Sequence, residues 1–315
     1  MIELSQRLTD RSNPLHIHLI GVAGSGMSGL ALLLLGMGHK VSGSDKVTTA
    51  ETERMQGVGL VFSSPPSAAA VKKVDMVVYS SAIKPANPAY AAAKKAKTPL
   101  YRRAECLAAI LHTKKGIVIS GTHGKTTTSS MTAHVLREAG QKPSHYVGAE
   151  IPILGANAKW SEDGDHMVAE GDESDGTLAL YRPEHAVILN IEAEHLDFYR
   201  DIEHIKEVFT KLADQTTGKL VYCAEDPVAL EVCSGRANGV SYGWEDADYT
   251  ATDVKTAGFT ATQMWGAGSG FDATALKSVG FSATDLKFEG GPTATQLKTA
   301  GYSAPQLKSG GFTAA

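Results

Sequence analysis

The stretch Gly121-Thr-His-Gly-Lys-Thr-Thr-Thr128 decides the fold of the region around it. It follows an apolar run, 116–120, and precedes a helix-like segment, Ser129–Arg137. A glycine-rich turn between a strand and a helix holds nucleotide phosphates, because backbone N–H groups and the helix N-terminus attract their oxygens. Lys125 is placed to neutralise the β- and γ-phosphates, and Thr126 is placed to reach Mg²⁺. An ordinary strand–turn–helix junction is the alternative, but it explains neither the lysine nor the threonines.

The composition is typical of an ordinary soluble protein. The chain has 315 residues, enough for two domains and an appendage, with 43% hydrophobic and 20% charged residues. A net charge of −4 gives no electrostatic case for nucleic acid or an anionic membrane surface. Cys106, Cys223 and Cys233 form no disulfide pattern and favour a reducing compartment. The most apolar run, 30–37, is too short to span a bilayer and residues 1–14 do not resemble a secretion signal, so we expect a cytoplasmic protein.

Short apolar strands alternate with helix-like stretches through most of the chain. We expect strands at 16–22, 40–44, 75–80, 116–120, 165–170, 186–190 and 219–223, and helices at 28–37, 89–97 and 129–137. This alternation predicts α/β domains with parallel sheets covered by helices. The expected organisation is a Rossmann-like domain at 1–113, a P-loop-type central domain at 114–248 and a tail at 249–315.

The tail repeats one unit about every 10 residues. Echoes of its first unit, Tyr249–Gly258, begin at Phe259, Phe271, Phe281, Pro292, Tyr302 and Phe312. The typical unit has an aromatic residue, then Ser or Thr as a helix N-cap, a Leu-Lys pair, and a final Gly as a helix stop. Burying two large side chains contributes ~3–6 kcal/mol, while ordering ten residues costs ~15 kcal/mol. We therefore expect short helices that stack on one another, with docking on the preceding domain or a mobile tail as alternatives. The sequence indicates no partner for this tail.

A second glycine-rich turn lies near the N-terminus. Gly24-Ser-Gly-Met-Ser-Gly29 follows a strand and precedes a helix, and Asp45 lies about 20 residues further on. The spacing is typical of a dinucleotide-binding turn. Any nucleotide diphosphate would fit the same physics, including a UDP-sugar, because the glycines let the backbone approach phosphates. A tight turn without a ligand is the alternative.

Acidic residues and a histidine follow two further strands. Glu170-Gly-Asp-Glu-Ser-Asp175 carries four carboxylates in six residues, which repel one another unless a cation is near. Mg²⁺ takes one or two carboxylates together with phosphate oxygens, so Glu170, at the strand end, is the expected ligand. A solvated acidic turn is the alternative. His195, in Asn190–Tyr199, is open to three interpretations: a metal ligand, a base or a surface histidine. Its place after a strand favours a ligand role, since ligands gather there in α/β sheets.

Taken together, these motifs resemble the Mur ligase family over about residues 15–248. The matching stretches, in family order, are His18–Leu30, Gly43–Asp45, Ser80–Ile83, Tyr101–Glu105, Gly121–Thr128, Glu170–Asp175 and Asn190–Tyr199. His123 separates the chain from members with Asn at that position. Ser174 favours the alanine-adding branch over the similar murein-peptide branch, which carries Tyr there.

The resemblance implies an ATP-dependent ligase of peptidoglycan precursor synthesis. Such an enzyme activates UDP-N-acetylmuramate as an acyl phosphate and joins it to L-alanine, with ATP and Mg²⁺. The implied catalytic residues are Lys125, Glu170 and His195, and the implied magnesium ligands are Thr126, Glu170 and His195. The implied ATP-binding residues are Gly121, Thr122, His123, Gly124, Lys125, Thr126, Thr127 and Asn190. The implied substrate-binding residues are Gly24, Ser25, Gly26, Met27, Ser28, Asp45, Ser81 and His123. Glu194 stands where many relatives have Asp.

The resemblance ends at Tyr249, where the repeats begin. The family's third domain, which closes over ATP, has no counterpart in this sequence, so we expect a fusion or truncation joint there. Closure by that domain aligns the amine with the acyl phosphate, and such alignment can be worth ~7–11 kcal/mol. We therefore expect ligation by this chain to be impaired. A nicotinamide-dependent oxidoreductase is an alternative that leaves Lys125 unused. A non-catalytic nucleotide- or UDP-sugar-binding protein with a repeat interaction tail is the other. We expect no nucleic-acid or membrane partner.

Overall fold

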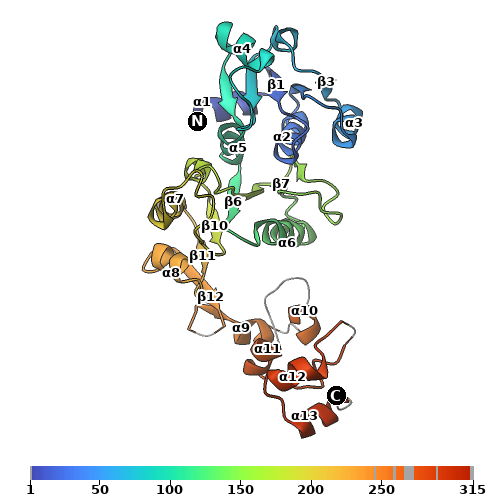
Figure 1. Ribbon diagram of the computed structural model, residues 1–315, viewed down its shortest axis with the longest axis vertical. Coiled ribbons are helices and arrows are strands. Elements are labelled where there is room, and N and C mark those ends of the chain that lie inside the picture. The colour runs from blue at the N-terminus through green and yellow to red at the C-terminus, as the bar shows by residue number, and fades with distance from the viewer. Residues whose placement is uncertain (1, 245, 258–259, 266–272, 289, 313–315) are drawn as a thin grey trace. The chain divides into compact units, whose positions relative to one another are not determined.

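The computed structural model describes residues 2–244, 246–257, 260–265, 273–288 and 290–312 (Figure 1). Its contacts divide the chain into two compact units. The first unit is Met1–Tyr222 with Val228–Gly239, and the second is Cys223–Pro227 with Val240–Ala315. The domain boundaries expected after residues 113 and 248 remain predictions.

The first sheet of the first unit is five-stranded and parallel, in the order β3-β2-β1-β4-β5. Its strands are β1 His16–Ile20, β2 Lys40–Ser44, β3 Val61–Ser63, β4 Met76–Tyr79 and β5 Leu100–Arg102. The helices around it are α1 Ile2–Thr9, α2 Ser25–Gly36, α3 Ala50–Gly57, the short η1 Ala68–Val71, α4 Pro88–Lys95 and α5 Arg103–Leu111. The parallel α/β fold predicted from the sequence is confirmed, with β3 and β5 as additional edge strands.

A second sheet in the same unit has the order β11-β10-β6-β9-β7-β8. Its strands are β6 Lys115–Ser120, β7 Ser144–Tyr146, β8 Ala158–Lys159, β9 His166–Glu170, β10 His185–Ile188 and β11 Leu220–Cys223. They pair in parallel, apart from β8, which is antiparallel to β7. The helices are α6 Lys125–Glu138, η2 Thr177–Leu180, α7 Ile202–Gln215 and α8 Pro227–Cys233.

Helices α2 and α6 begin earlier than the sequence predicts. The predictions placed their starts at Ser28 and Ser129, whereas the structure places them at Ser25 and Lys125. The reason is local, because each glycine-rich turn passes directly into the first helical turn, with Gly24 and Gly124 as the N-caps. The predicted strands 16–22 and 186–190 are shorter by two residues at their ends. The earlier starts of α2 and α6 place both glycine-rich turns directly at a helix N-terminus, where the backbone favours anions.

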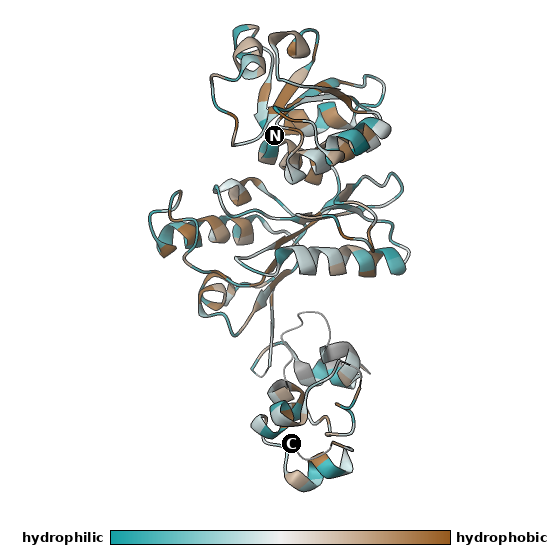
Figure 2. Ribbon diagram, turned by 45° about the vertical axis from the view of Figure 1, so that its right-hand side comes forward, coloured by the Kyte–Doolittle hydropathy of each residue, from teal (hydrophilic) through white to brown (hydrophobic). Residues whose placement is uncertain are grey.

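Apolar strand residues form the core of each sheet, as the brown strands of Figure 2 show. Ile17, Leu19 and Ile20 of β1 are fully buried, as expected for a parallel sheet covered on both faces. His18 lies in the same strand, and its ring nitrogens contact the hydroxyls of Ser42 and Ser44 at 2.9 and 3.0 Å. Burial, and to a smaller extent the neighbouring charge of His16, lowers the pKa of His18 to about 4. The imidazole is therefore neutral in the folded protein near pH 7.

The second unit contains β12 Gly239–Gly243, β13 Tyr249–Thr250 and the repeats. Its helices are α9 Ala251–Thr256, α10 Ala261–Trp265, α11 Ala273–Ser278, α12 Ala294–Thr299 and α13 Ala304–Ser309. Thr250, Thr293 and Ser303 cap α9, α12 and α13, as predicted from the repeat. The unit that begins at Phe281 forms a turn in place of a helix over residues 283–286. The predicted repeat starts Phe259 and Phe271 lie outside the described residues.

The repeats stack on one another through one shared cluster of buried side chains. Its largest members are Leu276, Phe281, Leu286, Leu297 and Tyr302. Three lysines each donate to a carbonyl 24 residues further on and lie over the aromatic ring that opens the repeat after that carbonyl. The contacts are Lys255 to Val279 and the Phe281 ring, Lys277 to Gly301 and the Tyr302 ring, and Lys287 to Gly311 and the Phe312 ring. Each of these three lysines therefore ties its unit to the unit two places along by a hydrogen bond and to the unit three places along by the ring contact, and the predicted stacking is confirmed. Within the described residues, the helices are all too short or too polar to cross a membrane.

Candidate functional site

The turn between β6 and α6 is built around two glycines with positive φ. Gly121 has φ +141° and Gly124 has φ +83°. A Cβ atom at Gly121 would lie 3.0 Å from the backbone N and O of Asn190, so this position has no room for a side chain. Asn190 braces the turn, because its backbone O accepts from Thr122 N at 3.1 Å and its Oδ1 accepts from His123 N at 2.7 Å. Hydrogen bonds to Asn190 therefore hold the turn at the end of the sheet.

The N-terminus of α6 faces this turn. Gly124, its N-cap, has no side chain to occupy the first N–H groups, so within the described residues these groups stay available for phosphate oxygens. The ammonium of Lys125 donates to Gly121 O at 2.6 Å, Thr122 O at 2.9 Å and Glu173 Oε1 at 2.9 Å. These contacts use all three of its N–H groups. Lys125 is thus folded onto the turn and must exchange a partner to contact a phosphate.

Glu173 is the buried partner of Lys125. Its side chain is 6% exposed, and burial raises the pKa of its carboxyl group against the opposing effect of Lys125. The structure also places His195 beside it, with Nε2 at 3.6 Å from Glu173 Oε1. The family resemblance implies that His195 acts with Glu170, whereas the carboxylate that it contacts in the structure is that of Glu173. No motif singled out Glu173 from its acidic neighbours, because only the fold shows which carboxylate points inward.

Thr126 and Glu170, the two predicted magnesium ligands from α6 and β9, lie in direct contact. Thr126 Oγ1 lies 3.0 and 3.1 Å from the two carboxylate oxygens of Glu170, and Gly148 N donates to Glu170 Oε2 at 2.6 Å. Among the described residues, no group of three or more His, Cys, Asp or Glu side chains is placed to hold a metal. A hydroxyl and one carboxylate suit Mg²⁺, which takes its remaining oxygens from phosphate and water.

One cavity of about 420 Å³ is lined by the N-terminal glycine-rich turn and by Lys125, the first residue of α6. Its lining includes the diphosphate turn (residues 24–27), Ser80, Ser81, Arg103, Lys125, Tyr146, Gly148, Glu170 and Asp172. The structure therefore brings together residues from both candidate ligand sites, which are separated by about 100 residues in the sequence. We call residues 170–175, which follow β9, the acidic turn.

Three of the predicted substrate-binding residues, Ser28, Asp45 and His123, are not part of this cavity lining. Ser28 is buried and donates to Ser25 O at 3.0 Å. Asp45 accepts from Ala23 N at 3.0 Å and so supports the chain just before the diphosphate turn. His123 is 60% exposed and lies 3.8 Å from the carboxylates of Glu192 and Glu194.

Arg103, Tyr146 and Asn157 were not predicted as site residues. Arg103 donates to Tyr146 Oη at 3.0 Å and to Asp172 Oδ2 at 2.8 Å, and Tyr146 Oη donates to Gly26 O at 2.8 Å. Asn157 donates to Ser25 O at 2.9 Å. Arg103 lies within the stretch 101–105 that carried the family resemblance, which is a usable signal. Tyr146 and Asn157 lie in no motif, so only the tertiary structure reveals them.

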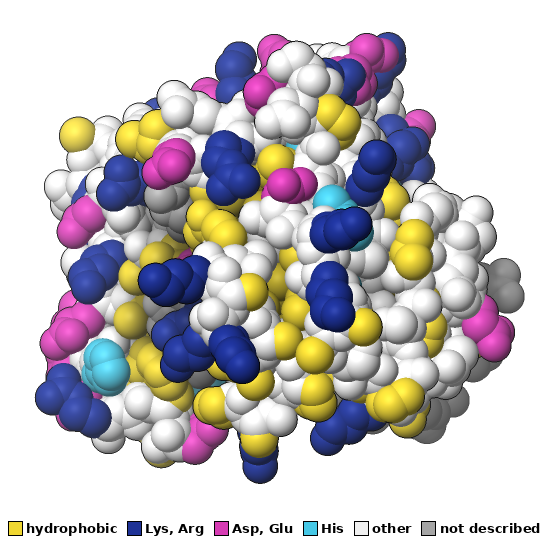
Figure 3. Space-filling model, turned by 90° about the horizontal axis from the view of Figure 1, so that it is seen from above, with side chains coloured by type: hydrophobic (Ala, Val, Ile, Leu, Met, Phe, Trp, Pro, Cys, Tyr) yellow, Lys and Arg dark blue, Asp and Glu magenta, His cyan; other side chains and the backbone are white. Residues whose placement is uncertain are grey.

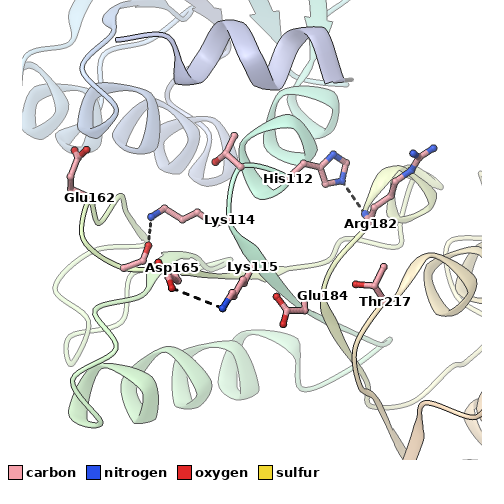
Figure 4. Close-up of a pocket in the computed structure, with 10 residues that line it drawn as sticks. His112, Lys114, Lys115, Glu162, Asp165, Arg182, Glu184 and Thr217 are labelled. Atoms are coloured by element: carbon pink, nitrogen blue, oxygen red, sulfur yellow. Dashed lines mark hydrogen bonds and ion pairs between the residues drawn. The ribbon is translucent and has the colours of Figure 1, made fainter.

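A second cavity, of about 590 Å³, lies at the opposite, amino ends of the strands (Figure 4). Its lining includes Lys114, Lys115, Asp165, Arg182 and Glu184, so charges of both signs face it. Ligands of open parallel sheets gather at the carboxyl ends of the strands, where the glycine-rich turns lie. The smaller cavity is therefore the candidate functional site, although the second one is larger.

Family models match the two α/β parts in order. Residues 16–115 match the Mur ligase family, catalytic domain, and residues 119–266 match the Mur ligase middle domain. This chain belongs to the Mur ligase family. Residues 248–315 match the decapeptide repeat region, which confirms the repeat predicted from Tyr249.

Similar proteins include curated Mur ligases from bacteria. The UDP-N-acetylmuramate–L-alanine ligase of Syntrophobacter fumaroxidans is 43% identical over 248 residues, which are 77% of this chain and 53% of that protein. The enzyme of the same name from Syntrophus aciditrophicus is 41% identical over 255 residues, 79% of this chain and 53% of that protein. This Mur ligase chain thus spans about half the length of the curated relatives it matches.

Solved structures show the same fold. The UDP-N-acetylmuramate–alanine ligase of Thermotoga maritima has a TM-score of 0.68 and 28% identity, covering 75% of this chain and 54% of that chain. The UDP-N-acetylmuramate:L-alanyl-γ-D-glutamyl-meso-diaminopimelate ligase of Neisseria meningitides also has a TM-score of 0.68, with 26% identity, covering 73% of this chain and 78% of that chain. The fold of this Mur ligase chain is therefore shared by relatives that add different amino components.

Proposed function

We propose that this chain takes part in ATP-dependent ligation of L-alanine to UDP-N-acetylmuramate through an acyl phosphate. The observation that carries the proposal is the shared cavity, in which the diphosphate turn lies together with Lys125 and Glu170. A ligase of this kind needs a nucleotide diphosphate and a nucleoside triphosphate side by side. The names of the curated relatives supply the two substrates. The Ser at position 174 supports L-alanine over a peptide as the amine.

The proposed reaction has two displacements. A carboxylate oxygen of UDP-N-acetylmuramate attacks the γ-phosphorus of ATP, and the bond to ADP breaks. The amine of L-alanine then attacks the acyl carbon and loses a proton, and phosphate leaves as the amide forms. The turn Gly121–Gly124 and the N-terminus of α6 hold the triphosphate. Lys125 exchanges Glu173 for a phosphate oxygen and stabilises the charge of the transferring group.

Thr126 and Glu170 would hold a magnesium ion, which would supply positive charge beside the phosphates of ATP. His195 remains a proposed ligand of a second magnesium ion. In the structure His195 contacts Glu173, so this role requires that contact to open.

We also propose a cytoplasmic location for this chain. On the face seen in Figure 3, basic and acidic side chains are interspersed with apolar ones.

The test is an assay of phosphate release with the full chain, Mg·ATP, UDP-N-acetylmuramate and L-alanine. Omission of any one component is expected to abolish release, and Glu170→Gln is expected to abolish it as well. The tripeptide L-alanyl-γ-D-glutamyl-meso-diaminopimelate serves as the matched alternative amine. Faster release with the tripeptide would contradict the assignment to L-alanine.

A separate measurement distinguishes ligation from simple binding. Hydroxylamine traps an acyl phosphate as a hydroxamate, so its formation without L-alanine reports the first displacement alone. Binding of both nucleotides with no hydroxamate and no phosphate release would favour a non-catalytic binding protein instead.

A further inference from the structure

The last two glycines of the diphosphate motif are explained by packing. A Cβ atom at Gly26 would lie 3.0 Å from Tyr146 Oη, and one at Gly29 would lie 3.1 Å from Asn157 Nδ2. By contrast, the nearest atom to a Cβ at Gly24 would be Gly21 O at 3.6 Å. Only Gly24 is therefore free on the side open to a ligand. Gly26 and Gly29 let α2 approach β7 and β8, as Figure 1 shows for α2 and β7.

Three hydrogen bonds continue from this contact across the cavity wall. Tyr146 Oη donates to Gly26 O at 2.8 Å and accepts from Arg103 at 3.0 Å, and Arg103 also donates to Asp172 Oδ2 at 2.8 Å. The tyrosine is 3% exposed and the arginine side chain is 19% exposed. The chain of bonds joins a carbonyl of the diphosphate turn to a carboxylate of the acidic turn.

The same loop also contacts the proposed magnesium ligand. Gly148, two residues after Tyr146, donates its N–H to Glu170 Oε2 at 2.6 Å. One short segment therefore contacts the diphosphate turn through its tyrosine and the acidic turn through its backbone. The two turns are therefore connected by hydrogen bonds through this segment and Arg103.

We propose that Arg103 and Tyr146 are positioning residues that fix the separation of the diphosphate turn and the acidic turn, so that binding of the UDP-sugar strengthens binding of Mg·nucleotide. This inference rests on the proposed function for the identity of the two ligands. The two affinities are linked, so each ligand must strengthen the other by the same factor. A ligand that holds one turn in place also holds the other turn, through the Arg103–Tyr146 bridge, in the position that the second ligand needs.

The test is calorimetric titration with a non-hydrolysable ATP analogue and Mg²⁺, with and without saturating UDP-N-acetylmuramate. In the wild-type chain the sugar nucleotide is expected to lower the Kd of the analogue at least about fivefold. Tyr146→Phe removes only the hydroxyl and is expected to reduce this factor below about twofold, the effect of losing a hydrogen bond. The Kd of the analogue alone stays within about twofold of the wild-type value. Tyr90→Phe, on α4, is the matched control and keeps the full factor.

A second variant tests the arginine independently. Arg103→Lys keeps the positive charge, but a lysine ammonium cannot replace the planar guanidinium group that contacts Tyr146 and Asp172 together. The sugar nucleotide is therefore again expected to lower the Kd of the analogue less than about twofold. Arg182→Lys, in the second cavity, is its control.

Two outcomes would overturn the inference. In the first, both Tyr146→Phe and Arg103→Lys keep the wild-type factor. In the second, both variants weaken the analogue alone and lower the melting temperature, as a purely structural role predicts. A wild-type chain that binds both ligands without coupling overturns this inference but leaves the proposed function intact. A wild-type chain that binds neither ligand overturns both.

Discussion

Replacement of Gly121 by alanine tests whether the backbone shape of the phosphate turn is needed for stability and for nucleotide binding, because it adds a methyl group but changes no charge. The backbone there has φ +141°, and a Cβ atom would lie 3.0 Å from Asn190 N, Asn190 O and Leu189 Cβ. Adopting this backbone costs a non-glycine residue about 1–3 kcal/mol. Forcing a methyl group into a filled space costs about 1–3 kcal/mol more. Gly121→Ala is therefore expected to lower the free energy of unfolding by about 2–6 kcal/mol.

The same change should weaken nucleotide binding, because relief of the contact moves Asn190 away from His123 N and Thr122 N. Gly140→Ala is the matched control, since Gly140 has φ +75° but no atom within 4 Å of its Cβ position. The control is expected to lose about 1–2 kcal/mol of stability and no nucleotide affinity. Urea unfolding measures the stabilities, and calorimetry with the ATP analogue measures the affinities. Equal stability losses and equal affinities in the two variants would refute the steric account of the turn.

Three further predictions follow from other parts of the chain. Because the unfolded chain binds a proton at His18 with pKa 6.5 and the folded chain only at about 4, stability is lost as the pH falls through this window, by about 2 kcal/mol at pH 5. His18→Gln should flatten that part of a urea-midpoint profile, and an unchanged profile would contradict the pKa. Thr126→Val should raise the Mg²⁺ concentration for half-maximal nucleotide binding about tenfold, whereas Thr126→Ser should not. Lys277→Met, which removes the bond to Gly301, should destabilise the repeats by about 1–2 kcal/mol. Lys298→Met is its control, and equal melting curves for the two variants would show that the contacts of Lys277 do not stabilise the repeats.

The strands that the sequence predicted are those with strong apolar runs, such as 16–22 and 116–120. Strands β3 and β5 were missed because each has only three residues and lies at a sheet edge, where one apolar face is enough. The repeat pattern predicted helical units, but residues 283–286 form a turn. Its side chains still join the shared cluster, so the packing positions of the repeat persist where the helix does not.

The site was predictable where a residue's role depends on its local turn. Lys125 and Thr126 follow a glycine turn, and their placement at the start of α6 follows from that turn alone. The contact between His195 and Glu173 depends on how separate strand ends meet, and the sequence could not decide between Glu173 and Glu170. The role of Tyr146 could not be predicted for the same reason, because its hydroxyl donates to the carbonyl of Gly26, 120 residues away in the sequence.

The central claim is that Lys125 and its turn bind the phosphates of Mg·ATP. Calorimetry of the ATP analogue with Lys125→Ala tests it most directly. Lys125→Ala combined with Glu173→Gln serves as a companion variant, because it removes the buried charge that the single change leaves unpaired. Both variants are expected to remain folded and to bind the analogue at least about tenfold more weakly than the wild-type chain, a loss of about 1.4 kcal/mol or more. Wild-type affinity in both variants would contradict the claim.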